Sequence, residues 1–214
     1  GLKTRGKKPE KLVPQVIQLW KSRREELFAA VRLNMERLRR FMETPKGNGL
    51  PGETIRAAFS DFVDRFDQRY GGCGGAPKFP TPHNLDFLLR YWKRTRDGRA
   101  LNMGEATLRA MRMGGIYDHV GFGFHRYSTD ERWLVPHFEK MLYDQAQLAM
   151  AYLEAYQVSG DPFFRRIGTE TLDYVLRDMT DGQGGFFSAE DADSAEPDDP
   201  AKHGEGSFYT WKSD

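Results

Sequence analysis

The sequence predicts an all-α protein, and more specifically a partial α/α toroid built from helical hairpins. Apolar residues recur at spacings of three and four along most of the chain, which is the pattern of amphipathic helices. A unit made of a Gly-Gly loop, a Pro-His helix start, a short turn and a second helix occurs twice, with Pro-His pairs at 82–83 and 136–137. The helix after the second pair is apolar nearly all round and the next is polar on one side, so buried inner and exposed outer helices are expected to alternate.

Helical segments are expected in the basic N-terminal part, over residues 11–42 with a break near Lys21. Residues 1–42 hold twelve Lys or Arg against four Glu, whereas the whole chain has a net charge of only +1. This basic arm is compatible with phosphate binding, but no nucleic-acid motif accompanies it. A solvated helix face is the favoured interpretation, and no nucleic-acid partner is expected.

Five further helices follow, most of them with a start or stop signal in the sequence. Thr81 and Asp161 each stand before a proline and are expected to be N-caps, with the proline at the first helical position. Glycine pairs are expected to end other segments. The helices are predicted over about 52–69, 81–96, 100–113, 135–158 and 161–179.

The long loops at 71–81, 114–135 and from 184 onward lead into the N-terminal ends of the inner helices. Because short turns close the other ends, these loops are expected to gather on one face, at the positive ends of the helix dipoles. Binding and catalytic residues concentrate in loops of this kind on a rigid scaffold.

The loop 114–137 carries three of the five histidines together with carboxylates and aromatic rings. Proton-transfer groups beside flat apolar faces are typical of pockets for sugars or other polar metabolites. A packed loop whose polar groups satisfy one another is the alternative. With the acidic loop 188–194, the candidate catalytic residues are His137, His125, Asp118, Asp130, Glu190 and Asp191. The candidate substrate-binding residues are His119, Arg126, Tyr127, Arg132, Trp133, Glu139, Asp144 and Asp193.

His137 is predicted to be the most function-sensitive of these residues. It is expected in the first turn of an inner helix, on the same face as Asp144, where the dipole favours a neutral imidazole that acts as a base or hydrogen-bond partner. Glu139 would lie on another side of that helix, so no metal is predicted. The chain has a single cysteine, Cys73, so no multi-cysteine metal site is predicted. It also lacks a dinucleotide-binding fingerprint, and no cofactor is predicted.

The sequence shows neither a transmembrane segment nor a signal peptide. No run of about 18 apolar residues is present, so no membrane partner is expected. The first residues lack the apolar region of a signal peptide, and the single cysteine fits a reducing compartment. A cytoplasmic location is therefore expected.

Three stretches form a recognisable motif: Gly-Gly-Cys-Gly-Gly-Ala-Pro-Lys-Phe-Pro at 71–80, the segment 114–144, and Gly-Gly-Phe-Phe-Ser-Ala-Glu-Asp-Ala-Asp-Ser at 184–194. They resemble the family that includes bacterial YyaL and spermatogenesis-associated protein 20. The resemblance implies a thioredoxin-like domain with a CxxC motif, followed by a six-hairpin toroid similar to N-acylglucosamine 2-epimerases and glycosidases. The sequence departs from the family at Cys73, where Phe is more frequent, and at Phe122, where Gly is usual.

On this resemblance, residues 1–50 are expected to be a basic helical arm or linker after a missing thioredoxin-like domain. Residues 51–214 are expected to be the first hairpins of an (α/α)6 toroid that is truncated at the C-terminus. An incomplete ring leaves apolar flanks exposed, so self-association is also expected.

The resemblance further implies a role in carbohydrate-related metabolism, with an acid/base site for a sugar or polar metabolite on the loop face. Glycosidase-like chemistry uses paired carboxylates, and the resemblance implies histidines for epimerase-like chemistry. The alternative is a non-enzymatic module that presents a partner or substrate to the attached thioredoxin-like redox domain.

Overall fold

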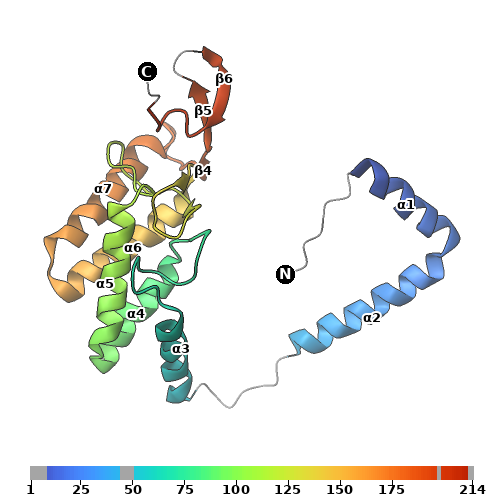
Figure 1. Cartoon of the computed structure of the whole chain (residues 1–214), viewed down its shortest axis with the longest axis horizontal. Coiled ribbons are helices and arrows are strands. Elements are labelled where there is room, and N and C mark those ends of the chain that lie inside the picture. Colours follow the sequence, from blue (N-terminus) through green and yellow to red (C-terminus); the bar gives the residue numbers. More distant parts are fainter. Residues whose placement is uncertain (1–8, 44–50, 197–198, 212–214) are drawn as a thin grey trace. The chain divides into compact units, whose positions relative to one another are not determined.

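The computed structural model describes residues 9–43, 51–196 and 199–211 of the chain. The chain divides into two compact units, Gly1–Pro51 and Gly52–Asp214, and each has its own arrangement. Figure 1 shows the helices and strands of both units. Within the described ranges, no helix is long and apolar enough to cross a membrane.

The first unit consists of α1 (Pro9–Ser22) and α2 (Arg24–Met42). The two helices meet at Arg23, so the predicted break is confirmed close to its expected place. Beside this junction the rings of Trp20 and Phe28 meet edge to face, with centroids 5.7 Å apart. No residue of α2 is buried, so its apolar stripe is exposed.

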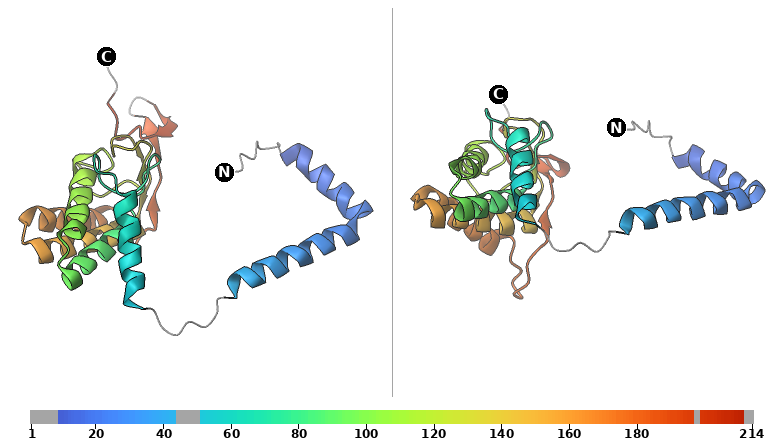
Figure 2. Two further views of the ribbon diagram at one scale, coloured as in Figure 1. Left: turned by 60° about the horizontal axis from the view of Figure 1, so that its bottom comes forward. Right: turned by 90° about the horizontal axis from the view of Figure 1, so that it is seen from below.

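The second unit is a partial α/α toroid of helical hairpins, as predicted. Its described part contains the helices α3 (Gly52–Arg65), α4 (Pro82–Thr95), α5 (Gly98–Met113), α6 (Leu142–Ser159) and α7 (Pro162–Asp178). Helix α4 packs against α5 and α6, and α6 packs against α7, which Figures 1 and 2 show from several sides. Helices α4 and α6 are therefore the inner helices, and α5 and α7 are the outer ones.

Large apolar side chains fill the seam between the two hairpins. Leu89 of α4, Leu148 of α6 and Ile167 of α7 are all fully buried. The Tyr152 ring is also enclosed, and its hydroxyl donates to the Leu108 carbonyl at 2.6 Å. Each such side chain contributes roughly 1.5–3 kcal/mol when it leaves water. This packing therefore stabilises the helices from which the long loops extend.

Of the two predicted N-caps, one is confirmed and the other is not. The Asp161 carboxylate accepts from the backbone N–H of Phe163 at 2.9 Å, so its predicted N-cap role is confirmed. Helix α4 begins at Pro82 as predicted, but the hydroxyl of Thr81 makes no capping bond. Thr81 has a left-handed backbone with φ 42°, not the extended conformation from which an N-cap side chain reaches the helix.

The apolar pattern predicts a start of α6 near Val135, but the helix begins at Leu142. The residues before it are extended and pair with other loops. The strand pairs are β1 (Tyr127–Ser128) with β2 (Pro136–His137), β3 (Lys140–Met141) with β4 (Ala189–Glu190), and β5 (Asp193–Glu196) with β6 (Asp199–Glu205), all antiparallel. These pairings engage the backbone groups that a longer helix would bond internally.

His137 consequently lies on a short strand and not in the first turn of an inner helix. The prediction that it shares a helix face with Asp144 is wrong, and the argument from the helix dipole does not apply to it. Asp144 itself lies in the first turn of α6. Any relation between the two residues must therefore come from the loops that surround them.

The three long loops contact one another above the inner helices. Lys78 forms a β-bridge with Ser128, which joins the first loop to the second. Lys140 pairs with Glu190, which joins the second loop to the third. The prediction that these loops gather on one face is confirmed by the two pairings. Figure 1 shows the second and third loops in the upper part of the second unit, with the loop 71–81 below them.

Candidate functional site

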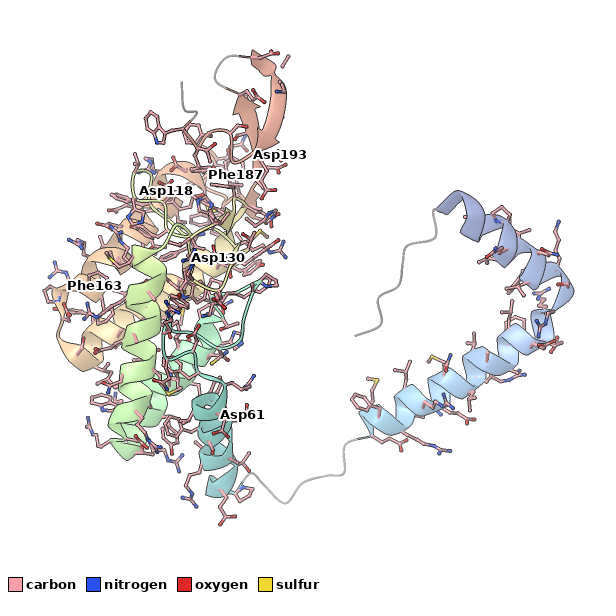
Figure 3. All side chains as sticks on the ribbon, in the orientation of Figure 1. Asp61, Asp118, Asp130, Phe163, Phe187 and Asp193 are labelled. Atoms are coloured by element: carbon pink, nitrogen blue, oxygen red, sulfur yellow. The ribbon has the colours of Figure 1, made fainter. Side chains whose placement is uncertain are left out.

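Polar side chains form two clusters on the loop face. The Arg126 cluster consists of Arg126, His137, Glu139, Asp144 and Glu205. The Lys140 cluster consists of Asp118, His125, Lys140, Tyr174, Glu190 and Tyr209. In Figure 3, Asp118 and Asp193 mark this end of the unit, and Asp61 of α3 marks the opposite end.

Arg126 and Glu139 form the centre of the first cluster. The Arg126 Nη1 donates to Glu139 Oε2 at 2.6 Å, and the backbone N–H of Arg126 donates to the Glu139 carbonyl at 2.8 Å. The two side chains are 40% and 25% exposed, so the pair lies at the surface of the loops and remains accessible. The guanidinium charge is largely compensated by its carboxylate partner.

His137 lies beside this pair. Its Nε2 is 3.8 Å from Glu139 Oε2, and its Nδ1 is 2.6 Å from Glu205 Oε1. The imidazole stacks on the Tyr127 ring with centroids 5.0 Å apart and an interplanar angle of 23°. The ring is thus held on one face and at one nitrogen, while about a quarter of the side chain remains exposed.

Asp144 is the buried acid of the cluster. The residue is 8% exposed, and its Oδ2 has no hydrogen-bond partner among the described residues. Burial raises the pKa of Asp144 to about 6; the Arg126 charge opposes this shift and the Glu139 charge adds to it. A carboxyl group in this state is able to hold or release a proton near neutral pH, as a general acid or base must.

Lys140 organises the second cluster. Its Nζ donates to Asp118 Oδ2 and to the Phe122 carbonyl, both at 2.9 Å. The ammonium also lies over the rings of Tyr174 and Tyr209, at 4.3 Å and 4.9 Å from their centroids. The side chain is almost fully buried, so these contacts compensate its lost hydration.

Glu190 completes the Lys140 cluster. Its two carboxylate oxygens accept hydrogen bonds from the hydroxyls of Tyr174 and Tyr209. A cleft of about 770 Å³ opens beside these groups and is also lined by Arg177 and Phe187. The Glu190 carboxylate therefore links Tyr174 of α7 to Tyr209, which lies later in the chain.

Besides Glu190, two further predicted catalytic residues, Asp118 and His125, lie in the Lys140 cluster. Burial acts to raise the pKa of Asp118, but Lys140 and the N–H groups of Gly121 and Val120 outweigh it, so the pKa lies below its ordinary value. The His125 imidazole is 2% exposed and its Nδ1 is 3.0 Å from the Phe138 carbonyl. Burial and then the Lys140 charge lower the pKa of His125 to about 4, so its ring stays neutral.

Two more predicted residues serve the fold of the loop. The Asp130 carboxylate accepts from the N–H groups of three later residues in its own loop, Arg132, Leu134 and Val135. The Trp133 side chain is 1% exposed, and its Nε1 donates to the Tyr70 carbonyl at 2.9 Å. The prediction that Trp133 stacks on a substrate is therefore corrected, because its ring belongs to the core.

The remaining predicted residues lie outside both clusters. His119 is bonded through its two ring nitrogens to Arg112 and to the Gly114 carbonyl. Arg132 is exposed, and its N–H group is used in the Asp130 turn. Asp191 accepts from the N–H of Asp193 at 3.1 Å, and both residues are exposed.

Sequence reasoning missed Lys140, Tyr174, Tyr209 and Glu205. A lysine is almost never fully buried, so nothing in the sequence marks Lys140 as a buried, paired cation. Tyr174 lies on the apolar side of α7, so the helical pattern predicts a buried ring but gives no hint of the partner of its hydroxyl. Nothing in the sequence links Glu205 to His137, because the register of the β5–β6 hairpin brings them together. Within residues 9–43, 51–196 and 199–211, no three His, Cys, Asp or Glu side chains form a set that would hold a metal ion.

Comparison with curated proteins identifies close relatives, although no family model matches the chain. Human spermatogenesis-associated protein 20 is 54% identical over 157 residues, which are 72% of this chain and 20% of that protein. A Caenorhabditis elegans protein named Uncharacterized protein B0495.5 is 36% identical over 168 residues, which are 76% of this chain and 23% of that protein. The chain thus spans about a fifth of the length of these relatives.

Comparison with solved structures supports the fold. A cellobiose 2-epimerase from Bacillus thermoamylovorans matches with a TM-score of 0.57 at 13% identity, over 65% of this chain and 40% of that chain. A sugar epimerase from a ruminal bacterium gives 0.57 at 15% identity over the same shares. A family 76 glycoside hydrolase (mannosidase) from Bacteroides thetaiotaomicron gives 0.52 at 16% identity, over 72% of this chain and 43% of that chain. These similarities concern the α/α toroid and not the side chains.

Proposed function

The chain belongs to the spermatogenesis-associated protein 20 family, and from this premise we propose that its Arg126 cluster binds a neutral sugar or a similar polyhydroxylated metabolite and exchanges protons with it. The observation that carries the proposal is Asp144, a buried acid with an unpartnered oxygen and a pKa raised to about 6. Structural relatives named as sugar epimerases and a mannosidase support carbohydrate as the ligand class.

The charges of the cluster favour a neutral ligand. Arg126 is already paired with Glu139, and His137 is bonded to Glu205. The carboxylates therefore outnumber the cations that are free to meet a ligand, and a sugar phosphate would be repelled. Sugar hydroxyls, in contrast, can donate to Glu139 and Asp144 and accept from the Arg126 guanidinium.

Two groups of the cluster are suited to proton transfer. Protonated Asp144 supplies a general acid near pH 6, and the His137 imidazole, bonded to Glu205 through Nδ1, supplies a base through Nε2. Tyr127, stacked on His137, adds a flat apolar face of the kind that sugar rings contact. This set supports the acid/base steps of epimerase-like or glycosidase-like chemistry, with a carboxyl and an imidazole as the working pair.

The test is a binding measurement by saturation-transfer NMR with neutral mono- and disaccharides and with the matching sugar phosphates. We expect neutral sugars to bind the chain and His137→Ala to lose binding while its unfolding free energy stays within about 1 kcal/mol of wild type. His203→Ala is the matched control, because His203 is exposed on β6. Binding that survives in His137→Ala, or a preference for phosphates, would contradict the proposal.

A second measurement separates catalysis from binding alone. Incubation of a bound sugar with the chain, followed by NMR of the sugar, would show epimerised or hydrolysed product if the cluster is an active site. Binding without any conversion would instead favour a non-enzymatic module that presents its ligand to a thioredoxin-like domain. The site would then be correct and the proposed chemistry wrong.

A further inference from the structure

Glu205 reaches the Arg126 cluster from the far end of the β5–β6 hairpin. It is the last residue of β6 and lies opposite Asp193 in the antiparallel register. Its carboxylate oxygen Oε1 is 2.6 Å from Nδ1 of His137, a residue 68 positions earlier in the chain. A short contact between such distant segments needs a reason in the local packing.

The packing next to Glu205 supplies that reason. Gly206 has φ +70°, and a Cβ at this position would lie 2.4 Å from the ring of Phe138. The N–H of Gly206 donates to the Ala192 carbonyl at 2.9 Å, which fixes the end of the hairpin. Since Phe138 follows His137 directly, close contact at Gly206 sets the carboxylate of Glu205 against the imidazole.

The hydrogen-bond roles in this contact follow from the chemistry of the groups. An ionised carboxylate only accepts, so the Nδ1 of His137 must carry the proton and donate it. The Nε2 of a neutral ring then holds a free lone pair. Its distance of 3.8 Å to Glu139 Oε2 is too long for a hydrogen bond, so this lone pair is free to accept a proton from a ligand.

We propose that Glu205 is the positioning residue of His137: it fixes the Nδ1–H tautomer and the orientation of the ring, and so presents Nε2 as the proton acceptor of the Arg126 cluster. When Nε2 takes a proton from a bound ligand, the imidazolium forms next to the Glu205 carboxylate, which stabilises its charge. The catalytic part of this inference rests on the proposed function, whereas the tautomer does not.

The tautomer is tested by ¹⁵N NMR of the imidazole nitrogens of His137 at a pH where the ring is neutral. We expect the Nδ1–H form in wild type and in Glu205→Gln, whose amide oxygen still accepts. We expect Glu205→Ala to lose this preference, and Asp199→Asn, another carboxylate change on β6, to leave it unchanged. An Nε2–H ring in wild type, or an unchanged ring in Glu205→Ala, would overturn the proposal.

Sugar binding and turnover provide the second readout. We expect Glu205→Ala to lower turnover more than binding and Glu205→Gln to restore part of it, because the amide keeps the tautomer without the charge. If no sugar binds, the proposed function fails while the tautomer result still decides the role of Glu205. Equal turnover in Glu205→Ala and wild type would refute the positioning role in catalysis.

Discussion

Lys140 and Asp118 form an ion pair inside the loop face, with Nζ 2.9 Å from Oδ2 and side chains that are only 1% and 11% exposed. Asp118 belongs to the loop after α5, and Lys140 belongs to the strand that leads into α6. The pair therefore ties the loop between the two hairpins to the inner helix that follows it. Because both charges have left water, neither is stable there without the other.

We expect Lys140→Met to destabilise the fold by about 3–5 kcal/mol, because it leaves the Asp118 carboxylate buried without its counter-ion. The double variant with Asp118→Asn should recover part of this loss, since no uncompensated charge then remains. Lys93→Met, at an exposed position of α4, is the matched control. Urea unfolding followed by circular dichroism measures all four proteins, and a double variant as unstable as Lys140→Met would contradict the ion-pair argument.

The arrangement of the helices could be predicted because burial leaves a direct trace in the sequence. The apolar circumference of α6 and the one-sided pattern of α7 report which helix is enclosed and which faces water. The start of α6 could not be predicted, because it depends on strand pairing with a loop some fifty residues away, through Met141 and Ala189. Pairing of this kind has no local signal.

The candidate site could be predicted only as a set of residues in one loop. Arg126, His137 and Glu139 do lie together, whereas Trp133 and Asp130 turn toward the core and their own backbone. In a loop, the sequence does not show whether an aromatic ring or a carboxylate contacts a ligand or packs against the rest of the protein. Loop residues have no regular repeat that fixes the direction of their side chains, so only the tertiary structure distinguishes the two cases.

Phe122 is the position where the sequence departs from the glycine that the family resemblance implies, and its backbone has φ 70°. We expect Phe122→Gly to be more stable than Phe122→Ala by about 1 kcal/mol, because alanine is strained in the left-handed region and glycine is not. Both variants lose the same ring contacts, so their difference isolates the backbone. At Lys93 in α4 the order should reverse, with alanine more stable than glycine. Equal stability of the two Phe122 variants would show that this strain is negligible.

Apolar side chains on the inner and outer helices remain open to solvent. Met150 of α6 is 51% exposed, and Leu172 and Leu176 of α7 are 41% and 65% exposed. With a net charge of +1, little electrostatic repulsion opposes contact between copies. We expect the chain to self-associate in sedimentation velocity experiments, and the double variant Leu172→Glu/Leu176→Glu to associate less. A wild-type monomer at high concentration would contradict this expectation.

Asp144 should make the stability of the chain depend on pH. Burial raises the pKa of Asp144 from its ordinary value of 3.8 to about 6 in the folded chain. Between these values the folded state holds a proton that the unfolded state releases, so the free energy of unfolding falls as the pH rises through this range. A shift of about two pKa units corresponds to a loss of about 3 kcal/mol by neutral pH.

The variant Asp144→Asn should escape this loss, because an amide side chain cannot ionise. Relative to wild type, we expect its unfolding free energy to increase by up to about 3 kcal/mol between about pH 4 and about pH 7. Using the difference between the two proteins removes the contribution of other carboxylates, such as Asp118, whose pKa is shifted the other way. Asp173→Asn, at an exposed position of α7, should show no such trend. A pH-independent difference for Asp144→Asn would mean that Asp144 is not protonated in the folded chain near pH 6, and it would remove the general acid from the proposed site.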